Sequence, residues 1–226
     1  MTVGCIIQAR MGSTRLPGKV MMTVDKNNPI LYYVVSQLRH CKFLDKIVIA
    51  TTDLKEDDEI IEFAQKLGID YFRGSSSDVL DRYYQCAIKF SFSNVVRITS
   101  DNPLIDPEIV DQVIKKFYSD SYDYVSNTLP RTFPYGTEAE IFTFKALQIA
   151  WKETKILYDR EHVTPYLYNN PNKFKIKSLV HSKNLSFLRW TVNHQKDLEL
   201  VRDIVSKINK KPILMVDIVN LLTNHE

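Results

Sequence analysis

Residues 8–19 read QARMGSTRLPGK, and the rest of the chain is organised around this stretch. They follow residues 3–7 (VGCII), an apolar run whose length and β-branched content predict a buried strand. The stretch holds two of the six glycines and the cations Arg10, Arg15 and Lys19. Glycine admits close approach of a ligand, and exposed N–H groups between a strand and a helix bind anions. The pattern predicts a polyphosphate-binding loop, with a solvated basic turn as the alternative.

Two familiar phosphate-binding patterns are missing from this loop. Neither the GxxxxGK[ST] pattern nor the GxGxxG pattern occurs in it. Its affinity for phosphate would therefore come from the three cations and the backbone, since arginine can grip phosphate oxygens in a bidentate way.

The composition is that of an ordinary globular protein of 226 residues with a net charge of +3. This mild charge, with no dense run of Lys or Arg, gives no reason to expect a nucleic-acid partner. No segment approaches the roughly 20 apolar residues of a membrane span, and no signal-peptide pattern is present, so we expect no membrane contact. Cys5, Cys41 and Cys86 are far apart and outside CxxC spacing, which predicts free thiols in a reducing cytoplasm.

Strand-like and helix-like segments alternate through the first 120 residues. Strands are predicted at residues 3–7, 46–51, 69–72 and 94–99, and helices at 30–39, 57–67, 78–90 and from 106 onward. Such alternation predicts an α/β fold with a mainly parallel sheet and helices on both faces. Ligands bind beyond the carboxyl ends of such strands, where residues 8–19, 73–77 and 100–101 would converge.

The second half is less regular. Strands are predicted at 124–127, 138–144, 174–179 and 188–192, and helices at 145–154, 159–168, 195–207 and 214–222. With no linker or repeat, we expect this part to continue the same domain, with a small protruding arm.

Asp101 is the leading candidate for chemistry. It follows a predicted buried strand, and a carboxylate there would face the phosphate loop and hold Mg²⁺ through oxygen. A helix or turn cap is the alternative for this residue. Asp106 is better explained as the cap of the next helix, since Pro107 and Glu108 follow it.

Five segments together resemble a known family. They are IIQARMGSTRLPGKVM at 6–21, DVLDRYYQ at 78–85, VRITSDNPLIDPEIVDQVI at 96–114, REHVTPYLY at 160–168 and LRWTV at 188–192. In this order they resemble the SpsF-type cytidylyltransferases, the spore coat polysaccharide biosynthesis protein F branch of the CMP-sugar synthetases, related to CMP-Kdo and CMP-N-acylneuraminate synthetases.

The resemblance implies a GT-A-like (Rossmann-like) α/β fold, CTP and Mg²⁺ as co-reactants, a homodimer and a cytoplasmic enzyme. It implies one nucleotidyltransferase domain over residues 1–226, with the acceptor and dimerisation part at about 130–180. The reaction would be an attack by an acceptor oxygen on the α-phosphorus of CTP. CMP-acceptor would form and pyrophosphate would leave. Such a reaction depends mainly on positioning and charge neutralisation.

The resemblance also implies roles for individual residues. Arg10, Arg15, Lys19 and Asp101 would be catalytic, the three cations holding the triphosphate. The nucleotide would further contact Ala9, Met11, Gly12, Ser13, Arg73, Ser75 and Ser100. Asp101 and Asn193 would hold Mg²⁺, although the family commonly has an acidic residue where Asn193 stands. An amide oxygen can coordinate Mg²⁺ but brings no negative charge.

The acceptor would be bound by a segment that resembles the family's RTxPxGxxxE pattern. The resemblance assigns the acceptor to Arg131, Glu138, Glu140 and Arg160. Tyr135 stands where the family often has Asp, and His162 is as well explained by packing as by function. The sequence leaves two other functions open, a GT-A-type glycosyltransferase and a non-catalytic nucleotide-binding protein. The cationic loop argues against the first, because a triphosphate needs more positive charge than a diphosphate sugar.

Overall fold

Four parallel strands form the first part of the sheet in the computed structural model, which describes residues 1–223. The strands are β1 (Val3–Gln8), β2 (Lys46–Thr52), β3 (Asp70–Gly74) and β4 (Asn94–Thr99). They are connected by α1 (Ile30–Leu38), α2 (Asp58–Lys66), α3 (Val79–Lys89) and short 3-10 turns η1 (Lys19–Met21) and η2 (Lys55–Asp57). Because all four strands run the same way, the loops that follow them meet at one edge.

Three more strands extend this sheet beyond β4. They are β5 (Tyr124–Ser126), β6 (Glu140–Thr143) and β7 (Ile176–Ser178), and the sheet order is β3-β2-β1-β4-β6-β5-β7. β6 runs antiparallel to β4, with Arg97 opposite Glu140. The first residue of β6 therefore lies beside the carboxyl end of β4, at the edge where the loops converge.

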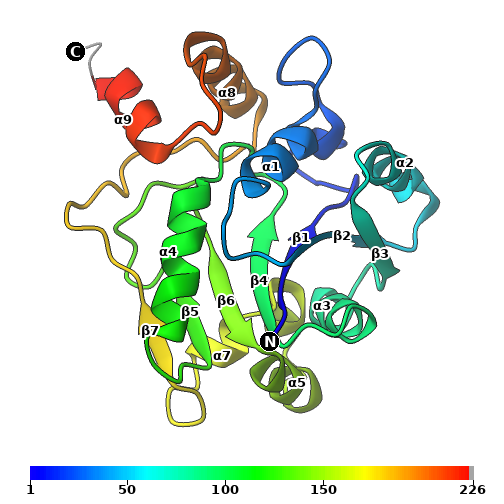
Figure 1. The fold of residues 1–226 in the computed structure, drawn as a ribbon. Helices are drawn as coiled ribbons and strands as arrows, with labels where there is room; N and C mark the ends of the chain where they lie inside the picture. Colours follow the sequence, from blue (N-terminus) through cyan, green and yellow to red (C-terminus); the bar gives the residue numbers. More distant parts are fainter. Residues whose placement is uncertain (224–226) are drawn as a thin grey trace.

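Helices cover both faces of the sheet, as the alternation predicts (Figure 1). One face packs against α1, α2 and α4 (Pro107–Tyr118), and the other against α3, α5 (Phe144–Glu153) and α7 (Pro165–Tyr168). Side chains of each strand alternate between the two cores, so Cys5 and Ile7 point to one face and Ile6 to the other. The predicted mainly parallel α/β fold is confirmed.

A third core lies at the end of the sheet toward which β4 points (Figure 1). There α8 (Gln195–Lys207) and α9 (Met215–Thr223) pack with residues of α1 and the fully buried Trp190. Asp106 caps α4 by accepting from the N–H groups of Glu108 and Ile109, as expected, and also accepts from the N–H of Met215. This contact ties the start of α9 to the start of α4.

Two predictions for the second half are wrong. Residues 188–192 form no strand. They lie alongside the loop after β4 instead, and the Val192 N–H donates to the Asp101 carbonyl there at 2.8 Å. The helix predicted at 159–168 is two short helices, α6 (Leu157–His162) and α7, because Val163 takes a positive φ of 73° and Pro165 has no N–H to continue the ladder.

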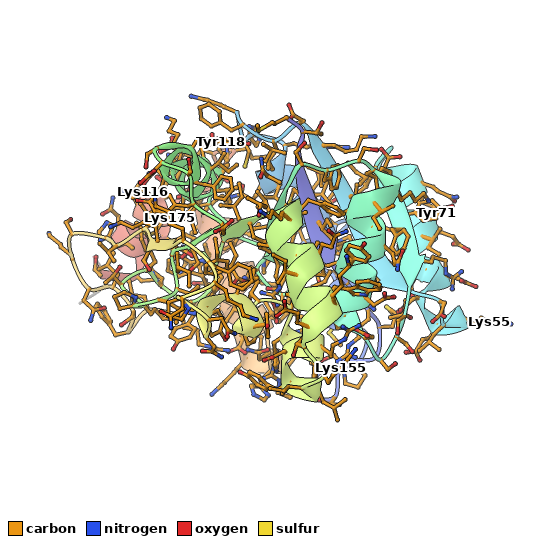
Figure 2. The ribbon with its side chains drawn as sticks, turned by 90° about the horizontal axis from the view of Figure 1, so that it is seen from below. Lys55, Tyr71, Lys116, Tyr118, Lys155 and Lys175 are labelled. Carbon is orange, nitrogen blue, oxygen red and sulfur yellow. The ribbon has the colours of Figure 1, made fainter. Side chains whose placement is uncertain are left out.

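The outside of the molecule carries scattered charge. Figure 2 shows Lys55, Lys116 and Lys155 well apart, with Lys175 near Lys116 in this view, so the four labelled lysines form no single basic patch. Among residues 1–223, no helix has the length and apolar character needed to cross a membrane.

Candidate active site

Two adjoining cavities open at the carboxyl edge of the sheet, and they share part of their walls. The first cavity, of about 360 Å³, lies under residues 8–20 and the ends of β1 and β4. The second, of about 450 Å³, lies between β4, the start of β6 and the segment around Arg189. Four residues line both cavities: Arg97, Thr99, Asp101 and His162. This boundary is where a group could pass from a molecule in one cavity to a molecule in the other.

The first cavity contains most of the predicted phosphate loop. Its lining includes the predicted residues Ala9, Arg10, Ser13, Arg15, Lys19, Ser100 and Asp101. The loop folds back on itself because the N–H groups of Ser13 and Gly18 both donate to the Met11 carbonyl. Gly18 has a φ of 68°, a conformation that side-chain-bearing residues rarely adopt, and it returns the chain so that Lys19 enters the cavity.

A buried carboxylate anchors this loop to the next strand. Asp57 is fully buried, and it accepts from the Met11 N–H at 2.7 Å and from the backbone N–H and hydroxyl of Thr52. Sequence analysis predicts Asp57 only as the start of a helix. Its position 46 residues after Met11 gives no signal of this contact.

Four predicted nucleotide residues lie outside the lining of the first cavity. Met11 and Gly12 belong to the loop but do not line the cavity, and the Met11 N–H donates to Asp57. Arg73 pairs with Asp58 at 2.7 Å and donates to the carbonyls of Thr52 and Leu54, which fastens β3 to the turn after β2. Ser75 accepts from the Asp78 N–H at the start of α3. The contacts of Arg73 and Ser75 are structural, and their nucleotide role stays a prediction.

Lys19 brings together the two residues predicted to hold a metal. Its ammonium lies 3.0 Å from Asp101 Oδ2, 3.4 Å from Asn193 Oδ1 and 2.7 Å from the Val192 carbonyl, and the residue is 7% exposed. The other carboxylate oxygen of Asp101 accepts from the Thr99 hydroxyl at 2.6 Å. The three side chains therefore form one cluster at the boundary between the cavities, with Lys19 in the first, Asn193 in the second and Asp101 in both.

The chemistry of this cluster fits Mg²⁺ and does not fit an all-protein metal cage. In the described part of the chain, no group of three or more His, Cys, Asp or Glu side chains could hold a metal ion. One carboxylate and one amide oxygen remain, from Asp101 and Asn193. Mg²⁺ typically takes one or two carboxylates and completes its coordination with water and substrate phosphates, so these donors suffice.

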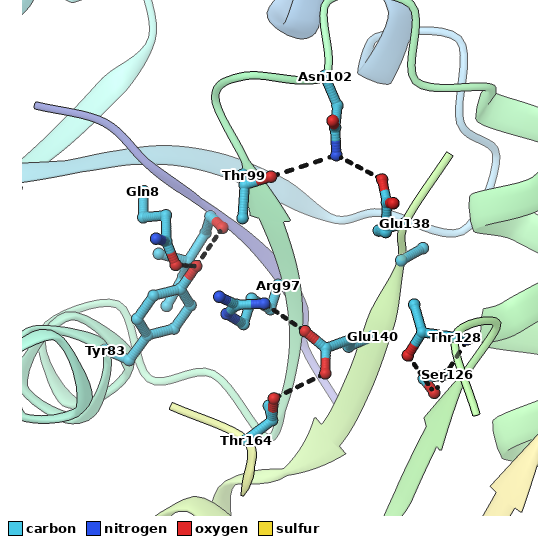
Figure 3. Close-up of polar contacts among 12 residues, drawn as sticks. Gln8, Tyr83, Arg97, Thr99, Asn102, Ser126, Thr128, Glu138, Glu140 and Thr164 are labelled. Carbon is cyan, nitrogen blue, oxygen red and sulfur yellow. Dashed lines mark hydrogen bonds and ion pairs between the residues drawn. The ribbon is translucent and has the colours of Figure 1, made fainter. Parts of the chain in front are cut away.

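The second cavity contains three of the four predicted acceptor residues. Arg131 pairs with Glu138 Oε1 at 2.7 Å, and Glu138 Oε2 accepts from the Gly136 N–H and the Asn102 amide (Figure 3). The centroid of the Tyr135 ring lies 3.9 Å from the guanidinium carbon of Arg131 and 5.6 Å from that of Arg189. These contacts hold Arg131 and Tyr135 in the cavity wall.

Arg160, the fourth predicted acceptor residue, lies outside the second cavity. Its guanidinium pairs with Asp78 at the start of α3 and donates to the Trp151 carbonyl at 2.7 Å. It fastens α6 to α3 and α5. The arginine of the REHVTPY motif is thus engaged in structure, while its neighbour His162 reaches the shared wall.

Sequence analysis missed two arginines of the cavity walls, the buried Arg82 and the partly buried Arg97. Arg82 is 2% exposed and lines the first cavity, and burial lowers the pKa of its guanidinium. Burial also opposes the charge of Arg97, but the facing Glu140 carboxylate outweighs it and raises the pKa of Arg97. The sequence signal for Arg97 is a charged residue within the apolar run 95–98 of β4.

Comparisons with known proteins give consistent results. A family model described as Cytidylyltransferase matches residues 4–218. The chain is 40% identical over 223 residues to an uncharacterized protein of Methanocaldococcus jannaschii, covering 92% of this chain and 90% of that protein. It is 34% identical over 215 residues to the spore coat polysaccharide biosynthesis protein SpsF of Bacillus subtilis, covering 92% and 88%. A cytidylyltransferase structure from Leptospira borgpetersenii superimposes with a TM-score of 0.95 at 34% identity, covering 100% of this chain and 95% of that chain.

Proposed function

The chain belongs to the cytidylyltransferase family as an SpsF-type member, and we propose from this premise that it transfers CMP from CTP to a small anionic acceptor. The acceptor is a sugar acid or a related surface-glycan precursor, and pyrophosphate is released. The observation that carries the proposal is the pair of cavities with a shared wall. A nucleotide in the first and an acceptor in the second would meet at Arg97, Thr99 and Asp101.

The cations of the first cavity suit a triphosphate. Arg10, Arg15 and Lys19 line it together with the buried Arg82. A triphosphate carries several negative charges, and fixed cations in a partly buried cavity offset them without reorganisation. We assign the α-phosphate to the shared wall and the departing pyrophosphate to Arg10, Arg15 and Lys19.

An anionic acceptor is supported by Arg189. This arginine lines the second cavity and, within residues 1–223, has no ion pair with a carboxylate, whereas Arg131 is neutralised by Glu138. Its guanidinium is available for a carboxylate or phosphate of the acceptor. Resemblance to the CMP-Kdo and CMP-N-acylneuraminate synthetases points to the same chemical class. An acceptor hydroxyl or phosphate oxygen then attacks the α-phosphorus.

Mg²⁺ is proposed as the cofactor, held by Asp101 and Asn193. When bound, it supplies positive charge to the phosphate oxygens. The Lys19 ammonium also supplies positive charge beside Asp101, with which it forms an ion pair at 3.0 Å. A cytoplasmic homodimer is proposed from the family resemblance, and its subunit number is measured by light scattering after gel filtration.

One assay tests the proposed function. The protein is incubated with each nucleoside triphosphate, Mg²⁺ and a panel of sugar acids and phosphorylated small molecules, and pyrophosphate is measured. We expect release with CTP that depends on one acceptor class. Release from no triphosphate despite CTP binding would contradict catalysis. Consumption of a nucleotide sugar instead of CTP would support the glycosyltransferase.

A further inference from the structure

We propose that Arg97 binds the α-phosphate of the nucleotide, the group that is transferred, and that Glu140 serves to position Arg97. This inference rests on the proposed function. It adds a phosphate-binding residue outside the opening loop, and it changes the role of Glu140 from acceptor binding to positioning.

The place of Arg97 in β4 aims it at the boundary between the cavities. Residues 97, 99 and 101 alternate along the chain, which puts Arg97 and Thr99 on the same face of the strand. Arg97, Thr99 and Asp101 line both cavities. The α-phosphorus is the atom that moves from nucleotide to acceptor, so it must lie where the two cavities meet.

Glu140 is fully engaged and holds the guanidinium in place. It faces Arg97 in the register of β4 and β6 and receives the Arg97 Nη1 on one carboxylate oxygen (Figure 3). The other oxygen accepts from the Tyr124 hydroxyl at 2.6 Å and the Thr164 hydroxyl at 2.7 Å. With its side chain 8% exposed, Glu140 has little surface left for a sugar hydroxyl.

The guanidinium of Arg97 keeps donors that this network does not use. Its side chain is 14% exposed, and its buried Nε has no hydrogen-bond partner among the described residues. Nη2 likewise makes no hydrogen bond to residues 1–223 in the structure. A guanidinium presents five N–H donors in a planar fork that matches phosphate oxygens. A purely structural ion pair would leave the buried Nε unsatisfied and Nη2 without a protein partner, whereas a phosphate at the boundary would accept from the open side of the guanidinium.

The test compares the binding of cytidine and CMP, which differ by the α-phosphate alone. Both are titrated calorimetrically without divalent metal, so neither the acceptor nor Mg²⁺ enters the measurement. In the wild-type protein we expect CMP to bind more tightly. Arg97→Met should reduce the ratio of the cytidine dissociation constant to the CMP dissociation constant by about 10-fold or more. A hydrogen bond to a charged group contributes a free energy of about this size.

Matched variants separate phosphate binding from a structural role. Arg97→Met/Glu140→Gln leaves no uncompensated buried charge, so it keeps the test available if the single variant fails to fold. The double variant should show the same decrease in the ratio of dissociation constants. Arg97→Lys, which keeps the charge but not the planar fork, should show a smaller decrease. Arg202→Met, which removes an arginine that donates to the Thr23 carbonyl outside both cavities, should leave the ratio unchanged.

The outcomes distinguish this inference from the proposed function. An unchanged ratio, which means equal weakening of cytidine and CMP, in Arg97→Met or, where that variant does not fold, in Arg97→Met/Glu140→Gln would overturn the role of Arg97. Failure of the wild-type protein to bind CMP or CTP would instead remove the proposed function on which the inference rests.

Discussion

Replacing Lys19 with methionine tests how the two halves of the site are joined. Methionine keeps the apolar stem and approximate volume of lysine but removes the ammonium, which contacts Asp101, Val192 and Asn193 at 3.0, 2.7 and 3.4 Å. Asp101 keeps the Thr99 hydroxyl, and its side chain is 24% exposed, so water can replace part of the loss. The Val192 carbonyl belongs to a buried residue and loses its charged donor.

The cost in stability follows from these contacts. A hydrogen bond to a charged group contributes about 1.5–3 kcal/mol, and a buried acceptor left without a donor costs about 1–3 kcal/mol. We expect Lys19→Met to lower the free energy of unfolding by about 1–3 kcal/mol in urea titrations at pH 7. Turnover should fall by about 10²–10³, the usual effect of losing one strong charge-stabilising contact.

Lys46→Met is the matched control. Lys46 pairs with Asp70 at 2.8 Å, but the two side chains are 42% and 51% exposed. An exposed pair of this kind contributes about 0–1 kcal/mol. Equal stability losses in the two variants, or CTP affinity and pyrophosphate release unchanged in Lys19→Met, would refute the reasoning.

Three other predictions concern Asn193, Arg160 and Asp25. Asn193→Asp adds a carboxylate beside Asp101, so Mg²⁺ should bind about tenfold more tightly in titrations with CTP present; unchanged affinity would remove Asn193 from the metal site. Arg160→Gln leaves Asp78 without its cation, so the free energy of unfolding should fall by about 1–3 kcal/mol while CTP affinity stays unchanged. A weakened CTP affinity would contradict the structural role of Arg160. Burial raises the pKa of Asp25, but hydrogen bonds from Asn28 and Tyr33 outweigh it and lower the pKa to about 2. The stability contributed by this carboxylate is full above the unfolded pKa of about 4 and is lost as pH falls toward 2. NMR titration should show a higher pKa in Tyr33→Phe, and no change would exclude the 2.6 Å hydrogen bond.

The regular half of the fold could be predicted because its signals are local. Apolar runs, helix caps such as Asp78 and Asp106, and the alternation of strand and helix are all visible within short windows. The segment 188–192 was misassigned because its apolar and aromatic residues belong to a third core built around Trp190, and burial of this kind produces the same pattern as a strand.

Residues of the candidate site could be predicted only where they cluster in one segment of the sequence or where the family resemblance assigns them. The loop from Ala9 to Lys19 was visible because glycines and cations cluster in it, and it does line the first cavity. Arg73 is predicted from the resemblance and from its turn at the carboxyl edge of the sheet, and Arg160 from its place in the REHVTPYLY motif. The carboxylates that engage them, Asp58 and Asp78, became apparent only from the packing of the chain. Asp57 and Arg97 act over long sequence separations that no local pattern records.

The antiparallel placement of β6 also has an evolutionary consequence. Because β6 enters at the edge where β4 ends, residues beyond 120 reach the second cavity, while the first is lined mainly by residues before 102. A mutation in the later part of a gene can therefore reshape the acceptor's surroundings while the donor loop stays unaltered. Duplicated copies of such a gene can diverge toward different acceptors and continue to draw on one common pool of donor nucleotide.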